Sequence, residues 1–254
     1  MGVLLDIDGT VLSAGEPIPG AADAIRELRR RGVPLLFATN TSRKSRDEVA
    51  ASLRDAGVDV ESSEVLSAGH AAAGYLRGQG VRRVHLLLTP SARRDWTDFR
   101  IDDEDPAAVV VGDLGTHFDF EVLNRAFRFL RQGATLVATQ KNRFWQASDG
   151  PTLDAGAFVA ALEYAAGVSS TVAGKPSAGF FRMGAEILGE PLGSLMIVGD
   201  DLESDIQGGR AAGLATCLVR TGKFHADQLA RTPPAQAPDH VIDSIADLPA
   251  LLTA

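Results

Sequence analysis

Short apolar runs alternate along the chain with longer segments in which apolar residues recur every three or four positions. The first pattern is typical of buried strands, and the second is typical of helices with one apolar face. Strands are predicted at 3–7, 33–40, 84–89, 106–113, 134–140, 170–174, 195–201 and 215–221. Helices are predicted at 19–32, 45–57, 67–80, 121–133, 154–167, 177–189, 203–213 and 245–252. This alternation predicts an α/β fold whose parallel sheet is built from βαβ units.

Polar side chains follow four of the predicted strands, at the point where each strand ends. They are Asp6 and Asp8 at the end of the first strand, Thr39 and Asn40 at the end of the second, Lys175 after the strand at 170–174, and Asp200 and Asp201, then Asp205, at the end of the strand at 195–201 and just beyond it. Ligands of open parallel sheets bind beyond the carboxyl ends of the strands. We therefore expect these side chains to form one site, although each of them alone is also explained by a turn, a helix cap or a solvated loop.

Asp6 and Asp8 are the most unusual pair, because side chains two residues apart on a strand point the same way. Two carboxylates about 4 Å apart repel by about 4 kcal/mol at an effective dielectric constant near 20. A shared proton, a lysine or a metal cation must therefore neutralise them. Mg²⁺ is a candidate because it prefers oxygen ligands, usually one or two carboxylates together with phosphate and water.

The combination of these groups predicts a phosphoryl-transfer site. One carboxylate can attack phosphorus and form an aspartyl-phosphate, and a second can protonate the leaving oxygen and later deprotonate water. Thr39, Asn40 and Lys175 are expected to hold the phosphoryl oxygens, where the charge of the transition state lies.

Four motifs in this order resemble the haloacid dehalogenase (HAD) superfamily, most of whose members are phosphatases. The motifs are "DIDGT" at 6–10, "ATN" at 38–40, "GKP" at 174–176 and "GDDLESD" at 199–205. The resemblance implies that Asp6 is the nucleophile and a metal ligand, and that Asp8 is the acid/base and binds metal through its carbonyl oxygen. It also implies that Asp200 is a metal ligand, that Asp205 supports the metal shell, and that Thr39 and Lys175 bind phosphate. Asp201 is not expected to be a direct ligand.

A closer resemblance is to the capped subfamily IIA of that superfamily. "TNTSRKSRDEVAASLRDAG", "VAGKPSAGFF" and "VRTGKF" look like the group that contains phospholysine phosphohistidine inorganic pyrophosphate phosphatase. This branch carries an α/β (C2-type) cap between its second and third motifs. The resemblance implies a Rossmann-like core at 1–79 and 170–254, an inserted cap at 80–169, and a homodimer formed through the cap as one option.

The overall composition argues against nucleic acid and membranes as binding partners. The 254 residues carry a net charge of −8, and a general nucleic-acid binder needs a basic surface instead. The single cysteine, Cys217, excludes an internal disulfide. The sequence contains no run of about 18 apolar residues, so no membrane span is expected. No signal peptide is recognised at the start of the chain, so the expected location is the cytoplasm.

Two further segments leave alternatives open. "KNRFWQASDG" at 141–150 places aromatic residues in a polar, turn-rich stretch, where they either cover the core of the cap or contact substrate. Arg143 and Trp145 are the candidates for substrate contact. "RTGKF" at 220–224 lacks a phosphate-loop signature, so a loop near the core is the expected role.

The function predicted from the sequence is therefore a Mg²⁺-dependent phosphatase that acts on a small phosphorylated molecule. Its substrate is a phosphate monoester, a phosphoramidate or pyrophosphate. The alternatives are a phosphotransferase and a phosphate-sensing protein on the same fold. A signalling receiver domain fits less well, because it has about half this length and places its phosphoacceptor on a later strand.

Overall fold

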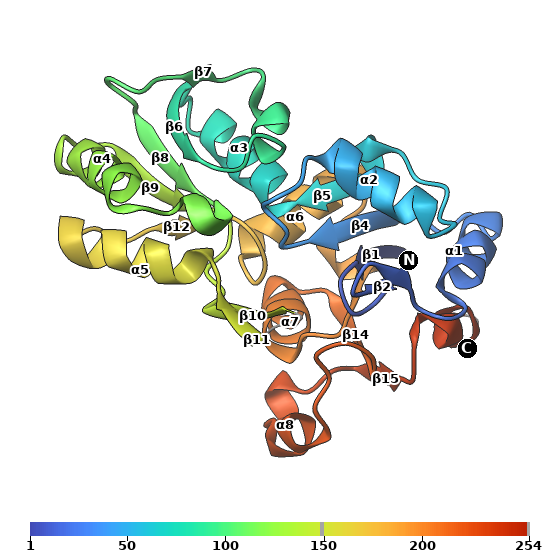
Figure 1. The fold of residues 1–254 in the computed structure, drawn as a ribbon. Helices are drawn as coiled ribbons and strands as arrows, with labels where there is room; N and C mark the ends of the chain where they lie inside the picture. Colours follow the sequence, from blue (N-terminus) through green and yellow to red (C-terminus); the bar gives the residue numbers. More distant parts are fainter. Residues whose placement is uncertain (148–149, 253–254) are drawn as a thin grey trace. The chain divides into compact units, whose positions relative to one another are not determined.

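A computed structural model describes residues 1–147 and 150–252, and these residues form two compact units. The first unit comprises Met1–Thr39, Asp47–Leu66 and the chain from Lys175 onward, and the second comprises Asn40–Arg46 and Ser67–Gly174. Each unit is built around its own sheet (Figure 1). The predicted α/β fold, with an α/β segment inserted into a Rossmann-like core, is confirmed.

The sheet of the first unit has the strand order β15-β14-β13-β1-β4-β5. Its strands are β1 (Gly2–Asp6), β4 (Leu35–Thr39), β5 (Val65–Ser67), β13 (Leu195–Gly199), β14 (Ala215–Val219) and β15 (His240–Ile242). The pairings of β1 with β4 and β13, of β13 with β14, and of β14 with β15 are parallel. Helices of this unit are α1 (Ala21–Arg30), α2 (Arg46–Asp55), α6 (Ala178–Leu188), α7 (Gly208–Ala212), α8 (Ala226–Arg231) and α9 (Leu248–Leu251).

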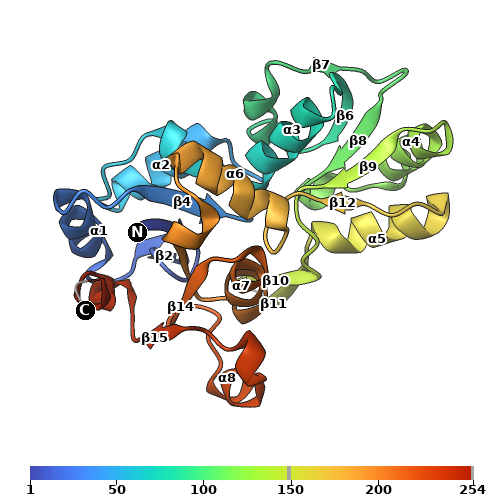
Figure 2. The same cartoon turned by 180° about the vertical axis from the view of Figure 1, so that it is seen from behind.

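Both faces of this sheet are covered, as the uninterrupted apolar run of β1 requires. Val3 and Leu5 belong to one buried cluster with Ile25 and Leu28 of α1. Leu4 points to the opposite face, because side chains alternate along a strand. There its methyl carbons lie 3.1–3.2 Å from the position that a Cβ on Gly184 of α6 would take. Figures 1 and 2, seen from opposite sides, accordingly show α2 on one face of β4 and α6 on the other.

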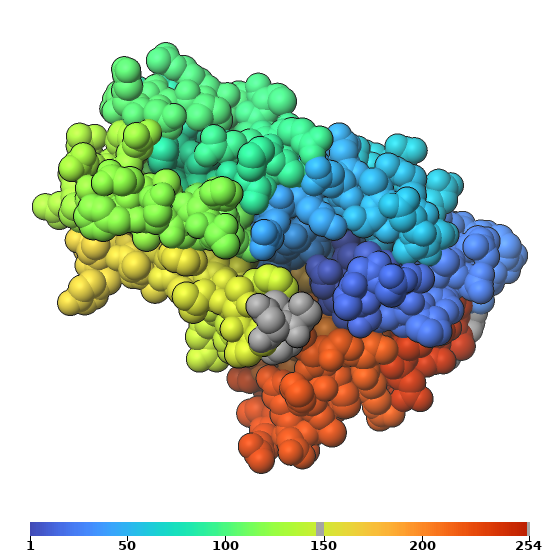
Figure 3. Space-filling model, in the orientation of Figure 1, coloured from blue at the N-terminus to red at the C-terminus, as the bar shows by residue number. Residues whose placement is uncertain are grey.

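Early and late segments of the chain form one sheet in the first unit. β1, at the start, pairs with β13, which follows the inserted second unit in sequence. Figure 3 shows the early segments in blue and the late segments in orange and red next to each other on the surface of this unit. Residues nearly 200 positions apart in sequence are therefore brought to the same sheet edge.

The second unit contains a sheet with the order β12-β9-β8-β6-β7. Its elements are β6 (Arg83–Leu87), β7 (Arg100–Ile101), β8 (Ala108–Val111), β9 (Thr135–Ala138), β12 (Thr171–Val172), α3 (Ala68–Gly78), α4 (Phe120–Arg131) and α5 (Ala155–Ala166). Val109 and Val111 of β8 lie in one apolar cluster with Phe129 of α4 and Val159 and Leu162 of α5. This unit therefore has a core of its own.

The structure also contains two short hairpins. β2 (Leu12–Ser13) pairs with β3 (Glu16–Pro17), and β10 (Phe144–Ala147) pairs with β11 (Gly150–Leu153). The strands of the second hairpin take up 144–147 and 150 of the segment 141–150, which was expected to be turn-rich; Ser148 and Asp149 lie outside the described residues. No helix among the residues described has the length and apolar character needed to cross a membrane.

The division into a core at 1–79 with 170–254 and a cap at 80–169 stays a prediction, and the compact units differ from it at three places. They group Asn40–Arg46, residues 67–79 with α3, and residues 170–174 with the inserted part. The backbone N–H groups of Ser45 and Arg46 donate to the Ser91 hydroxyl at 2.9 Å and the Asp95 carboxylate at 3.0 Å. These contacts explain why the segment after Thr39 packs with the inserted part.

Candidate active site

The sheet of the first unit reverses its direction of growth next to β1. From β1 the chain moves outward through β4 and β5, and it later fills the other side of β1 with β13, β14 and β15. Asp6 pairs in register with Ala38, which precedes Thr39, and Asp200 directly follows Gly199 at the end of β13. Such a reversal is where open α/β sheets bind ligands. The structure thus brings Asp6, Thr39 and Asp200 to one edge.

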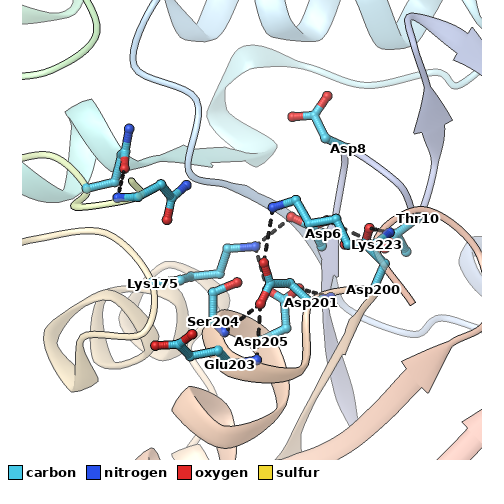
Figure 4. A network of polar contacts seen from close by, with 12 residues as sticks. Asp6, Asp8, Thr10, Lys175, Asp200, Asp201, Glu203, Ser204, Asp205 and Lys223 are labelled. Atoms are coloured by element: carbon cyan, nitrogen blue, oxygen red, sulfur yellow. Dashed lines mark hydrogen bonds and ion pairs between the residues drawn. The ribbon is translucent and has the colours of Figure 1, made fainter. Parts of the chain in front are cut away.

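Lys175 joins two carboxylates at this edge (Figure 4). Its Nζ lies 2.5 Å from Oδ1 of Asp6 and 2.6 Å from Oδ1 of Asp205. The side chains of Lys175 and Asp205 are 2% and 1% exposed, and that of Asp6 is 8% exposed. Among the partners that the sequence analysis left open for Asp6, the structure therefore shows a lysine.

One ammonium does not compensate the buried carboxylates. Burial raises the pKa of Asp6 to about 7, with the Lys175 charge opposing this rise and the Asp200 charge adding to it. Burial likewise raises the pKa of Asp205 to about 7 and that of Asp200 to about 6. Burial disfavours the charged form of Lys175 too, but Asp205 and Asp6 outweigh it and raise its pKa. The site therefore has more carboxyl groups than ammonium groups, and ionising all three carboxyl groups leaves an excess of negative charge.

This charge excess fits a divalent cation. Asp6, Asp200 and Asp205 each offer a carboxylate oxygen, and these oxygens all lie within 4.8 Å of one another. Three carboxylates and one ammonium leave two negative charges, which one Mg²⁺ would neutralise. The oxygen-only donor set also suits a hard cation. The cluster can therefore hold a metal ion.

The segment after β13 positions Asp205. It is a π-helical turn, Leu202–Gln207, and Asp201 caps its start by accepting hydrogen bonds from the N–H groups of Glu203 and Ser204, both at 3.0 Å. A Cβ on Gly199 would lie 2.3 Å from Oδ2 of Asp205, so only glycine leaves room for this carboxylate. Asp201 acts here as a cap, in keeping with the expectation that it is not a direct ligand.

Asp8 does not share the buried volume of Asp6, which corrects the expectation drawn from their spacing. β1 ends at Asp6, so the strand geometry that would align the two side chains stops there. Asp8 is exposed and stands apart from the hydrogen-bonded network in Figure 4. Its carboxylate accepts a hydrogen bond from the hydroxyl of Thr39 at 3.5 Å. The chain thus presents one buried, anchored carboxylate and one accessible carboxylate.

Three other predicted site residues belong to the second unit. Asn40 lies next to Gly174, where a Cβ would come within 2.7 Å of its Oδ1. Arg143 and Trp145 lie at the start of the β10–β11 hairpin; Arg143 is exposed, and Trp145 is 39% exposed. Their roles in phosphate and substrate binding stay predictions.

The loop after β14 is a part of the site that the sequence analysis did not assign. The backbone N–H of Lys223 donates to Oδ2 of Asp200 at 2.6 Å, and its ammonium lies 3.0 Å from Oδ2 of Asp201. The available signal was "VRTGKF", which contributed to the family resemblance and was otherwise interpreted as a loop near the core. Periodicity does not reveal such a contact, because a backbone donor leaves no trace in residue type.

Two family models match the chain, one near its beginning and one near its end. A haloacid dehalogenase-like hydrolase model matches residues 3–101, and a HAD-hydrolase-like model matches residues 172–248. The chain is 34% identical over 257 residues to the phospholysine phosphohistidine inorganic pyrophosphate phosphatase of Rattus norvegicus, covering 99% of this chain and 93% of the relative. The chain belongs to the haloacid dehalogenase-like hydrolase family. This hydrolase is a phosphatase of subfamily IIA, as the motifs predicted.

Solved structures agree with this assignment of the hydrolase. The 4-nitrophenylphosphatase of Thermotoga maritima superposes with a TM-score of 0.91 at 30% identity, over 98% of this chain and 95% of that one. The glycerol phosphate phosphatase of Mycobacterium tuberculosis, solved in complex with magnesium, superposes with a TM-score of 0.88 at 30% identity. That match covers 97% of this chain and 75% of the other.

Proposed function

We propose that this hydrolase is a Mg²⁺-dependent phosphatase that forms an aspartyl-phosphate on Asp6. The observation that carries the proposal is the buried cluster of Asp6, Asp200 and Asp205 around Lys175 at the carboxyl edge of the sheet. The magnesium in the Mycobacterium tuberculosis phosphatase supports the choice of metal. The substrate is a small molecule that carries a phosphate monoester, a phosphoramidate or a pyrophosphate group.

The two carboxylates of the first motif take different roles in this proposal. Lys175 holds Asp6 through Oδ1. The other oxygen, Oδ2, accepts a hydrogen bond from Thr10 that is long, at 3.5 Å, so Oδ2 remains able to attack phosphorus. Asp8, exposed beside Thr39, protonates the departing oxygen and then takes a proton from the water that attacks the aspartyl-phosphate. That second attack releases inorganic phosphate and regenerates the carboxylate of Asp6.

The other polar groups of the site bind the metal ion and the phosphoryl oxygens. Asp6, Asp200 and Asp205 would hold Mg²⁺, with Asp8 contributing its carbonyl oxygen. When bound, the metal supplies positive charge against the phosphoryl oxygens. Thr39, Asn40 and Lys175 bind those oxygens and stabilise the charge of the transition state.

Removing the metal should abolish hydrolysis of p-nitrophenyl phosphate. We expect no turnover in excess EDTA and full recovery on adding Mg²⁺, because the carboxylate excess is then neutralised. Ca²⁺ should support little activity, since its larger and more flexible shell disturbs the in-line geometry. Phosphate release, measured with each ion, tests this.

Full turnover in EDTA would contradict the metal dependence. Metal binding without any phosphate release would instead support the phosphate-sensing alternative. Transfer of phosphate to an added alcohol or sugar in preference to water would support the phosphotransferase alternative. A screen of phosphorylated metabolites, with pyrophosphate included, would then define the substrate.

Trp145→Ala should alter substrate preference without altering the chemistry of phosphoryl transfer. If the indole contacts only the leaving group, kcat/KM should fall by different factors for different metabolites and stay near wild type for p-nitrophenyl phosphate. Tyr164→Ala is the matched control, because Tyr164 is an aromatic residue of the same unit that is 93% exposed on α5. Equal losses for every substrate would show that the tryptophan supports folding of the second unit.

A further inference from the structure

The loop from Thr221 to Lys223 touches both acidic strand ends of the first unit. The Thr221 hydroxyl donates to the backbone carbonyl of Gly9 at 2.5 Å, and the Lys223 N–H donates to Oδ2 of Asp200 at 2.6 Å. Gly9 follows the Asp6–Asp8 motif, and Asp200 follows β13. The loop therefore connects the turn after β1 to a carboxylate of the candidate metal cluster.

Gly9 and Gly222 face each other at this junction. A Cβ on Gly222 would lie 2.0 Å from Oδ2 of Asp200 and 2.6 Å from the Cα of Gly9. A Cβ on Gly9 would also lie 2.0 Å from the same carboxylate oxygen and 3.0 Å from the Cα of Gly222. Distances this short leave no room for a side chain at either position. The carboxylate of Asp200 is therefore enclosed by two backbone segments.

A third contact anchors the loop. The Lys223 ammonium pairs with the Asp201 carboxylate at 3.0 Å (Figure 4), and Asp201 also caps the helical turn that carries Asp205. The same loop thus holds the turn after Asp6, the carboxylate of Asp200 and the cap of the segment that positions Asp205.

We propose that Thr221, Gly222 and Lys223 are positioning residues that fix the Asp200 carboxylate for metal binding. This inference rests on the proposed function, because it assigns the loop a purpose in the same site. Groups that orient metal ligands typically change metal affinity by about 10- to 100-fold when they are removed. The loop should therefore control how tightly the cluster holds a divalent cation.

The test measures binding of Mn²⁺ or Mg²⁺ alone by isothermal titration calorimetry, with no substrate present. Gly222→Ala should raise the metal Kd by about 10- to 100-fold, because the new Cβ displaces Asp200. Gly189→Ala is the matched control: Gly189 has φ +68°, close to the +58° of Gly222, but a Cβ there meets nothing within 4 Å. It should lower Tm through the same backbone strain and leave the metal Kd unchanged.

A second pair of variants covers the case in which Gly222→Ala fails to fold. Thr221→Val removes the hydroxyl donor to Gly9 and should weaken metal binding by about tenfold. Thr221→Ser keeps the hydroxyl and should restore the wild-type Kd. A purely structural role would lower Tm in Thr221→Val while leaving the metal Kd unchanged.

The outcomes separate this inference from the proposed function. Tight metal binding by the wild type with unchanged Kd in Gly222→Ala and Thr221→Val would overturn the loop's role and leave the phosphatase proposal standing. Weakened binding in those variants, from a wild type that releases no phosphate, would support the loop's role and contradict the phosphatase proposal. A wild type that binds neither ion would overturn both.

Discussion

Asp6→Asn should form no phospho-enzyme and release no product from any substrate. An amide cannot supply the carboxylate oxygen that attacks phosphorus, so both half-reactions are lost. Asp8→Asn should behave differently with p-nitrophenyl phosphate, because nitrophenolate is a stable leaving group without protonation. This variant should still phosphorylate Asp6 but hydrolyse it slowly, since no base remains to activate water.

Rapid mixing distinguishes the two variants. We expect Asp8→Asn to give a burst of nitrophenolate close to one equivalent of enzyme, followed by slow turnover about 10²- to 10⁴-fold below wild type. Asp6→Asn should give no burst. With an alkyl phosphate, whose leaving oxygen needs a proton, Asp8→Asn should be nearly inert.

The structure explains why neighbouring, chemically identical residues should differ so strongly. Asp6 is buried and fixed by Lys175, whereas Asp8 is exposed beyond the end of β1. A burst from Asp6→Asn and none from Asp8→Asn would show that the two roles are reversed. Circular dichroism of both variants controls for loss of fold.

Lys175→Met should destabilise the metal-free protein more than removal of an exposed ammonium does. Breaking a buried ion pair by removing one partner costs about 3–5 kcal/mol, because the remaining charge stays buried and uncompensated. Here the residues left behind are Asp6 and Asp205. Lys141→Met is the control: its pair with Glu163 is partly exposed, and such pairs contribute about 1 kcal/mol or less. Urea unfolding at pH 8 measures both.

The pH dependence of this effect has a definite sign. Asp6 and Asp205 have folded-state pKa values of about 7, raised from 3.8, so between these values the folded protein binds more protons than the unfolded chain. Their contribution to stability is present below pH 3.8 and is lost as the pH rises through about 7. Metal-free wild type should therefore lose stability through these groups between pH 5 and pH 8, and Lys175→Met should lose more.

Mg²⁺ provides the second arm of the same experiment. Ions that bind only the folded state stabilise it, so Mg²⁺ should offset much of the loss at pH 8 in the wild type. A Lys175→Met variant with the same loss at pH 5 and pH 8, insensitive to Mg²⁺, would show that the ammonium does not balance these carboxylates.

The sequence was sufficient for the α/β fold and for the edge of the sheet at which the site forms. Strands buried on both faces read as uninterrupted apolar runs, so β1, β4 and β13 were visible directly. Stability alone gives polar residues at the ends of such strands no reason to lie close together. Because parallel strands bring their carboxyl ends to one edge of the sheet, these residues indicated a ligand site there. Strands of only three or four residues, such as β5, β10, β11 and β15, were missed because so short a segment shows no readable periodicity.

What only the tertiary structure decided was the partner of each charge. Lys175 contacts Asp6 across 169 positions of sequence, and Lys223 contacts Asp200 through a backbone N–H that no residue type reveals. The strand geometry that would align Asp6 with Asp8 also ends at Asp6, two residues before Asp8. The pattern of apolar residues along the chain shows which face of a helix or strand is buried, because that pattern belongs to a single element. The balance of charge in a buried site depends on several elements at once, and it is set only when they pack together.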